Sequence, residues 1–96
     1  MAIKKYESVL AELGCIVCKN LGYSESPAEI HHPRFGQGLS QRAGKYLAIP
    51  LCSQHHRLGG KGVALHAGQK SFESLYGEEL DLLDQVIEEV FRGKFR

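Results

Sequence analysis

The 96-residue sequence lacks any long hydrophobic run. A membrane-spanning helix needs about 20 consecutive apolar residues, and no stretch approaches that length. The first ten residues, MAIKKYESVL, also lack the apolar core of a signal peptide. From these two absences we expect a soluble protein of the cytoplasm without a membrane partner.

The sequence also lacks the even set of cysteines that a disulfide framework needs. It has three cysteines, accompanied by five histidines. Reduced thiols together with several imidazoles are typical of metal sites in a reducing compartment. A chain this short buries only a small core, so a bound metal would be a natural source of stability.

Net charge is nearly absent, at +1 near neutral pH, but the charges are unevenly distributed. Residues 1–70 contain nine lysines and arginines against four acidic residues, whereas residues 71–96 contain three against seven. The basic portion holds every cysteine and histidine. This distribution favours a polyanionic partner, although surface lysines also serve solubility in any small domain.

No internal repeat, linker or low-complexity segment interrupts the sequence, which predicts a single domain over residues 1–96. Apolar spacing predicts a helix over residues 4–13, stopped by Gly14. Short apolar runs predict strands over residues 28–32 and 45–51, with Pro50 marking a sheet edge or a strand end. With a long loop between the strands and a helix that begins near Cys52, these elements form a ββα unit in an α+β fold.

Helical spacing returns after Ser71, breaks at Gly77 and continues in a last helix over residues 78–92. We interpret the apolar stripe of that helix as core, with a subunit contact as the alternative. The stripe comprises Leu80, Leu83, Ile87, Val90 and Phe91.

Two cysteine motifs predict a zinc site. Cys15 and Cys18 form a C-x-x-C turn, which lets two thiolates reach one tetrahedral ion. Alone, such a pair also fits a redox couple or two buried apolar cysteines. The later Cys52-x-x-His55 motif supplies a second pair of ligands. We therefore predict one structural Zn²⁺ held by Cys15, Cys18, Cys52 and His55.

Four histidines remain outside this set: His31, His32, His56 and His66. His55 and His56 are adjacent, and successive residues of a helical turn point about 100° apart. One imidazole can therefore join Cys52 on the zinc while its neighbour faces another site. A single extra histidine is more often a satisfied structural residue, but four near glycine or proline turns favour convergence on one polar site.

The order of these motifs resembles the HNH endonucleases of the ββα-metal fold, a small zinc-stabilised, treble-clef-like domain with flanking helices. Within that superfamily, the segments IHHPR, IPLCSQHHR, LHAG and FESLYG resemble the phage recombination-enhancement nucleases described as RecA-dependent. The resemblance covers residues 15–77. It implies a phage or prophage protein in a bacterial host cell that cleaves DNA during recombination, with a recombinase filament as a candidate partner.

The resemblance also implies roles for the histidines. His31 and His56 would hold a catalytic divalent ion, with His66 as a third ligand, and His32 would be the general base that takes a proton from water. The ion stays open between Mg²⁺, Mn²⁺, Ni²⁺ and Zn²⁺, although imidazoles suit zinc or nickel better than magnesium. We expect DNA phosphates to contact the basic residues Arg34, Arg42, Lys45, Arg57 and Lys61.

Two positions depart from the HNH pattern, and two other functions stay open. Many HNH enzymes have aspartate in place of His31, and the asparagine of the motif falls near Leu47, which cannot orient a base. The three cysteines and five histidines also fit two closed zinc sites in a non-catalytic DNA- or protein-binding adaptor. The C-x-x-C pair by itself also fits a redox or metal-storage protein.

Overall fold

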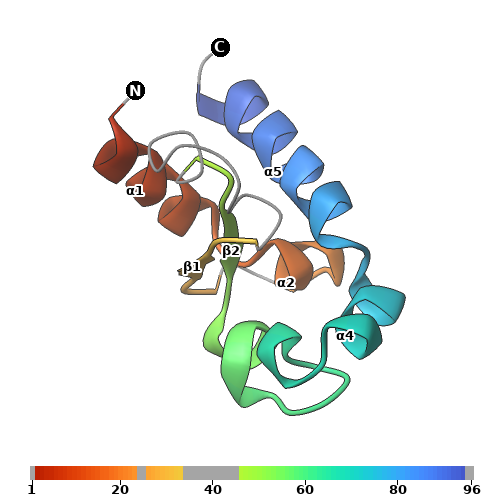
Figure 1. The fold of residues 1–96 in the computed structure, drawn as a ribbon. Helices are drawn as coiled ribbons and strands as arrows, with labels where there is room; N and C mark the ends of the chain where they lie inside the picture. The colour runs from red at the N-terminus through yellow and green to blue at the C-terminus, as the bar shows by residue number, and fades with distance from the viewer. Residues whose placement is uncertain (1, 24–25, 34–45, 95–96) are drawn as a thin grey trace.

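A pair of short antiparallel strands lies between the two longest helices of the computed structural model, which describes residues 2–23, 26–33 and 46–94 (Figure 1). β1 (Glu29–His31) pairs with β2 (Ile49–Leu51), and Ile30 lies opposite Pro50. α1 (Ile3–Leu13) contacts both strands, while α5 (Glu79–Lys94) contacts β2 and α1. The small α+β fold predicted from the sequence is therefore present.

β1 matches the predicted strand to within one residue at each end, but β2 is shorter than predicted. Residues 46–48 precede β2 without strand structure, and Lys45 lies outside the described residues. Buried and exposed side chains do not alternate along β2, since Ile49, Pro50 and Leu51 are all buried. The reason is that β2 is covered by α1, by α5 and by the short helix α2 (Ile16–Asn20). The C-x-x-C segment was predicted as a turn, but Cys15 is the N-cap of α2 and Cys18 lies within this helix.

α1 follows its predicted boundaries closely. Tyr6 and Leu10 on its inner face are buried. Gly14 ends the helix with a φ of 83°, a conformation that favours glycine. A Cβ atom at this position would also lie 3.1 Å from the carbonyl oxygen of Ser26, which is closer than most Cβ contacts in proteins.

The two C-terminal helices are separated at Gly77, as predicted: α4 (Gln69–Tyr76) ends there, and α5 begins at Glu79. Part of the predicted apolar stripe on α5 is wrong, since Leu80 and Phe91 are 62% and 61% exposed. The buried apolar residues of α5 are Leu82, Leu83, Val86 and Val90.

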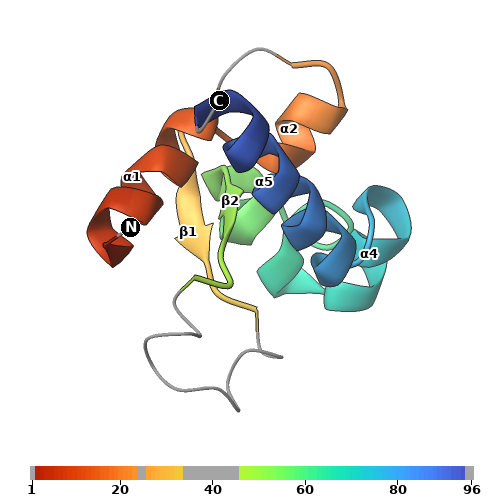
Figure 2. The ribbon, with the colours of Figure 1, turned by 90° about the horizontal axis from the view of Figure 1, so that it is seen from above.

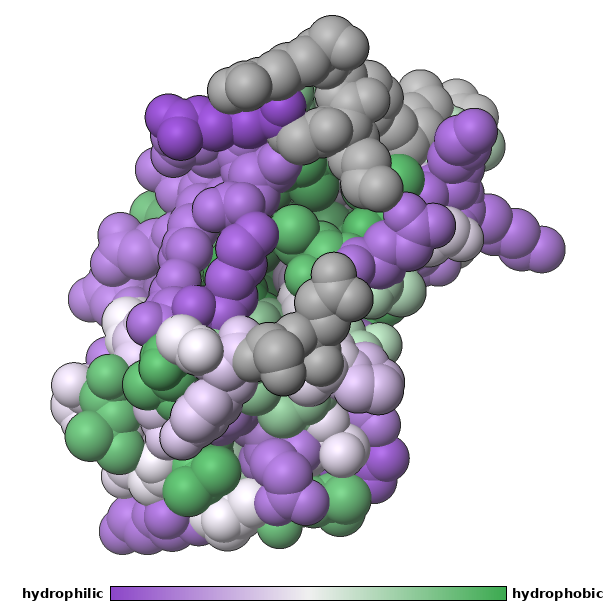
Figure 3. Space-filling model, turned by 180° about the vertical axis from the view of Figure 1, so that it is seen from behind, coloured by the Kyte–Doolittle hydropathy of each residue, from purple (hydrophilic) through white to green (hydrophobic). Residues whose placement is uncertain are grey.

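The core forms where the helices close over the strands. Phe72 from α4, Leu10 from α1 and Ile49 from β2 are each 0% exposed. From above, α1 and α4 lie at opposite ends of the molecule with α5 between them (Figure 2). From behind, hydrophobic residues gather at the centre of the face, with hydrophilic residues around them (Figure 3). Within the described ranges, no helix combines the length and apolar character needed to cross a membrane.

The chain after β2 forms a π-helical turn, η2 (Gln54–Leu58), where the sequence predicted an ordinary helix beginning near Cys52. The N–H of Gly59 donates to the carbonyl of Gln54 at 2.9 Å, five residues earlier. A Cβ atom on Gly59 would lie 2.4 Å from Cγ1 of Val63, so only glycine fits there. The 3₁₀ turn η3 (Leu65–Ala67) then packs between η2 and α4.

We expect Phe72→Ala to lower the free energy of unfolding by about 3–5 kcal/mol, because it removes a fully buried ring and leaves a cavity. Leu75 lies on the same helix but is 64% exposed. Leu75→Ala should therefore change the free energy by less than about 0.5 kcal/mol. Urea unfolding of the metal-saturated protein measures both values. Equal losses in the two variants would contradict the placement of Phe72 in the core.

Candidate metal sites

Three thiols and one imidazole converge where α2 meets the start of η2. Cys15 is the N-cap of α2, and its Sγ accepts the N–H of Cys18 at 3.4 Å. Cys52 directly follows β2, and His55 lies in η2. One ligand atom from each of these four residues lies within 4.8 Å of the others. The four residues predicted to hold the structural ion thus lie together.

The spacing of these atoms fits a tetrahedral zinc ion. The Sγ atoms of Cys18 and Cys52 are 3.8 Å apart. Nδ1 of His55 lies 3.2, 3.5 and 3.6 Å from the Sγ atoms of Cys52, Cys18 and Cys15. Zn–S bonds of about 2.3 Å and Zn–N bonds of about 2.0 Å imply separations of about 3.8 Å between sulfurs and about 3.5 Å between sulfur and nitrogen. The cluster could therefore bind a metal such as zinc.

The chemistry of the buried cluster also fits a metal ion. All three cysteines are free thiols. Burial raises the pKa of Cys15 to about 12, and burial lowers the pKa of His55. The imidazole is therefore favoured in its neutral, ligating form, whereas a thiolate at Cys15 needs the positive charge of an ion beside it.

A second group contains three imidazoles from three separate elements. One ring nitrogen from each of His31 in β1, His56 in η2 and His66 in η3 lies within 4.8 Å of the others. The rings of His56 and His66 are closest, with centroids 4.4 Å apart. The side chains of His31 and His56 are only 12% and 13% exposed. In the part of the chain that the structure describes, the group has these three members. A tetrahedral ion held by three imidazoles would have one coordination position left for a further ligand such as water.

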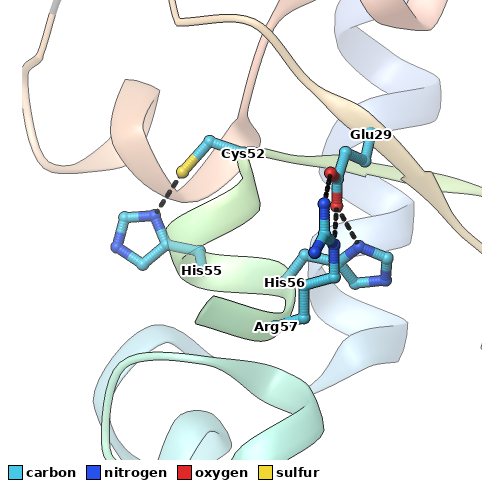
Figure 4. A network of polar contacts seen from close by, with 5 residues as sticks. All are labelled: Glu29, Cys52, His55, His56 and Arg57. Atoms are coloured by element: carbon cyan, nitrogen blue, oxygen red, sulfur yellow. Dashed lines mark hydrogen bonds and ion pairs between the residues drawn. The ribbon is translucent and has the colours of Figure 1, made fainter. Parts of the chain in front are cut away.

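The adjacent residues His55 and His56 face different groups. Figure 4 shows His55 directed toward Cys52 and His56 directed toward Glu29, on another side of η2. The same short turn therefore supplies one imidazole to the thiol cluster and one to the group of three histidines. Any ion held by the thiols would fix the position from which His56 projects.

A glutamate from α5 contacts His31, and sequence reasoning did not identify it. Oε2 of Glu79 lies 2.5 Å from Nε2 of His31, and Gln69 donates to the other carboxylate oxygen at 2.8 Å. The side chain of Glu79 is 7% exposed. From the sequence, Glu79 is only an acidic residue that suits the first turn of a helix. Nothing in the sequence relates it to a histidine 48 residues earlier.

A second glutamate, Glu29, contacts His56 and was also missed. Its Oε1 lies 2.8 Å from Nδ1 of His56, and its Oε2 accepts from Nη2 of Arg57 at 2.7 Å. For Glu29, the sequence did contain a signal of this contact. Glu29 and His31 are two residues apart on one predicted strand, so their side chains share a face of that strand. A carboxylate on the face of a predicted metal ligand is a candidate partner for that site.

The protonation of these groups follows from their surroundings. Burial lowers the pKa of His31, although the carboxylate of Glu79 opposes this shift. Hydrogen bonds from Arg57 and then His56 lower the pKa of Glu29 to about 2, and the same pairing raises the pKa of Arg57. Near neutral pH, Glu29 is therefore an anion and His31 favours the neutral form that binds metals.

The three imidazoles line a pocket of about 620 Å³. His32 lines the same pocket but is not a member of the three-histidine group. Its side chain is 42% exposed, and its Nε2 lies 3.9 Å from Oε2 of Glu7 in α1. The four histidines outside the thiol cluster thus surround one cavity, with His32 separate from the others.

Two of the five basic residues predicted to contact DNA lie in the described part of the chain. Arg57 is 52% exposed and pairs with Glu29. Lys61 is exposed and lies beside Gly68, which lines the pocket: a Cβ atom on Gly68 would be 3.6 Å from Cγ of Lys61. The other three fall outside the described residues, and their contacts stay predictions: Arg34, Arg42 and Lys45.

The chain is thus a small α+β protein with a cysteine–histidine cluster that could bind zinc and a pocket lined by three grouped histidines. Over residues 2–91 the chain matches the model of a family described as recombination enhancement, RecA-dependent nuclease, and it belongs to that family. This match confirms the resemblance to the recombination-enhancement nucleases described as RecA-dependent, and the description implies a nuclease that acts in recombination. No curated protein and no solved structure matches the chain.

Metal removal should unfold the chain, because a structural zinc site contributes on the order of 10 kcal/mol. We expect a strong chelator to abolish the cooperative melting transition seen by circular dichroism. His55→Ala should lower zinc content and melting temperature together. Its exposed neighbour Gln54 provides the control, since Gln54→Ala leaves all four ligands in place. A melting temperature that survives chelation would reject a structural ion at this cluster.

Proposed function

We propose that the chain is a metal-dependent endonuclease of the HNH type, which hydrolyses phosphodiester bonds in DNA. The observation that carries this proposal is the pocket in which three histidines form a group and a fourth, His32, stands apart. The family description supports a nuclease. The order of the elements supports the HNH type, since two antiparallel strands are followed by a helical turn that carries Cys52-x-x-His55 at its start.

In this proposal His31, His56 and His66 hold the catalytic divalent ion, and the thiol cluster holds a structural Zn²⁺. Three protein ligands leave an open coordination position, which a catalytic site needs for water or substrate. Imidazole ligands favour Zn²⁺ or Ni²⁺ over Mg²⁺, while Mn²⁺ is intermediate. The bound ion would neutralise charge on the scissile phosphate and on the leaving oxygen.

His32 is the proposed general base. It takes a proton from water, the water oxygen attacks phosphorus, and the bond from phosphorus to the leaving oxygen breaks as that oxygen gains a proton from solvent. Leu47, near the position of the motif asparagine, packs against the core and offers no hydrogen bond. The carboxylate of Glu7 in α1 lies 3.9 Å from Nε2 of His32.

The arrangement argues against a two-zinc adaptor. In the adaptor hypothesis, His32 is the fourth ligand of a second closed tetrahedral site. Within the described ranges His32 is not part of the ligand group, and its exposed side chain suits a reaction with water.

The family description also supports DNA as the substrate and RecA as a partner. The place of action in this proposal is the cytoplasm of a bacterium that carries the phage or prophage. Arg57 and Lys61, both exposed, would contact backbone phosphates and would carry no sequence preference.

Replacing His32 should separate catalysis from metal binding. His32→Ala should reduce DNA cleavage by about 100-fold or more, as expected for loss of a general base. Because His32 is outside both ligand groups, metal content and melting temperature should stay at the parental values. Nicking of a supercoiled plasmid in the presence of RecA and a series of divalent ions measures the activity. Parental cleavage in this variant, or the loss of an ion, would reject the assignment.

DNA binding should depend steeply on salt, because phosphate contacts release counterions. Lys61→Gln should reduce the slope of log K against log salt by about 1, with little dependence on DNA sequence. Lys19→Gln is the matched control, since Lys19 pairs with Glu89 at 2.7 Å on the side formed by α2 and α5. Fluorescence anisotropy with a labelled oligonucleotide gives both slopes. An equal slope for parent and Lys61→Gln would remove Lys61 from the DNA-binding surface.

A further inference from the structure

We infer that Glu79 and Glu29 are positioning residues that orient His31 and His56 as ligands of the catalytic ion. The inference rests on the proposed function, because it concerns the ion of that site. A histidine that binds a metal usually donates its other ring N–H to a carboxylate or carbonyl, which fixes the ring and raises the basicity of the ligating nitrogen. Two of the three grouped histidines meet this condition here.

Neither carboxylate is a member of the ligand group, although Glu79 lines the same pocket. The group whose ligand atoms lie within 4.8 Å contains His31, His56 and His66. Glu79 contacts Nε2 of His31 at 2.5 Å, and Glu29 contacts Nδ1 of His56 at 2.8 Å. Each glutamate thus touches one imidazole by a single nitrogen, which is the arrangement expected of an outer partner.

Both carboxylates are themselves held in place. Gln69 fixes the second oxygen of Glu79, and Arg57 fixes the second oxygen of Glu29 at 2.7 Å. The backbone N–H of Glu79 also donates to a side-chain oxygen of Glu73 at 3.0 Å. A carboxylate with both oxygens engaged has little freedom to rotate, so it can hold its imidazole in one orientation.

These contacts assign the ligating atom of each ring. A neutral imidazole has one N–H and one nitrogen with a free lone pair. The nitrogen that faces a carboxylate carries the proton, so the metal is left with Nδ1 of His31 and Nε2 of His56. The two rings therefore bind the ion through different nitrogens. The two nearby negative charges would also offset part of the charge of the ion.

Metal titration tests the inference independently of DNA cleavage. Protein with zinc in the thiol cluster and with the histidine site emptied by a mild chelator is titrated with Ni²⁺ in a calorimeter. Glu79→Ala and Glu29→Ala should each weaken Ni²⁺ binding by about 10- to 100-fold. Glu79→Gln and Glu29→Gln keep an oxygen acceptor but lose the charge, and each should weaken binding by at least about threefold. Glu78→Gln, an exposed neighbour of Glu79, should leave the affinity unchanged.

The glutamine variants keep the test decisive if an alanine variant fails to fold. A melting temperature of the zinc-loaded protein equal to that of the parent excludes a general loss of structure. Long-range ¹⁵N–¹H spectra of the parent with Zn²⁺ in the histidine site should show Nδ1 of His31 and Nε2 of His56 bound to metal. The opposite nitrogens, or unchanged Ni²⁺ affinity in both glutamine variants, would overturn the inference.

The same experiment distinguishes failure of the inference from failure of the proposed function. If the variants bind Ni²⁺ like the parent while the parent cleaves DNA with the ion, only the positioning role is rejected. If the variants bind Ni²⁺ weakly but the parent cleaves no DNA with RecA present, only the nuclease proposal is rejected. A parent that binds no ion at the histidines rejects both.

Discussion

The arrangement of the molecule depends on one turn that must satisfy two groups of ligands at once. η2 is connected to β2 through Cys52, and it contributes His55 to the thiol cluster and His56 to the pocket. A displacement of the backbone of this turn would move both imidazoles, because the two residues are adjacent in the chain. The thiol cluster, which could bind a metal such as zinc, and the pocket lined by the three histidines therefore share one turn of the backbone.

The sequence was most informative where chemistry imposes a local spacing. C-x-x-C and C-x-x-H each place two donors within one turn, so the four members of the thiol cluster could be recognised without knowledge of the fold. The boundaries of α1 and the break at Gly77 were also predictable, because apolar spacing and glycine act over a few residues. The resemblance to the family also predicted that His31, His56 and His66 lie together, which the structure shows.

The sequence was least informative where distant segments meet. Glu79 reaches His31 only after α5 has packed on β2, and no local pattern encodes that contact. The prediction of which residues of α5 are buried was partly wrong for a related reason. Leu80 and Phe91 are as apolar as Leu82 and Val86, and only the position of the neighbouring elements decides which of them become buried. The burial of every residue of β2 likewise follows from helices on several sides, which cancels the alternation expected of a strand with one solvated face.

The π-helical geometry of η2 has a consequence for how the chain tolerates insertions and deletions. A π-turn contains one residue more than the α-turn that could replace it. Deleting one residue between His56 and Gly59 would leave both histidines in sequence but return the turn to ordinary helical closure. The segment that leads to His66 would then be rotated by about 100° relative to His56. The length of this turn, as much as the identity of its histidines, thus keeps η3 in register with the pocket.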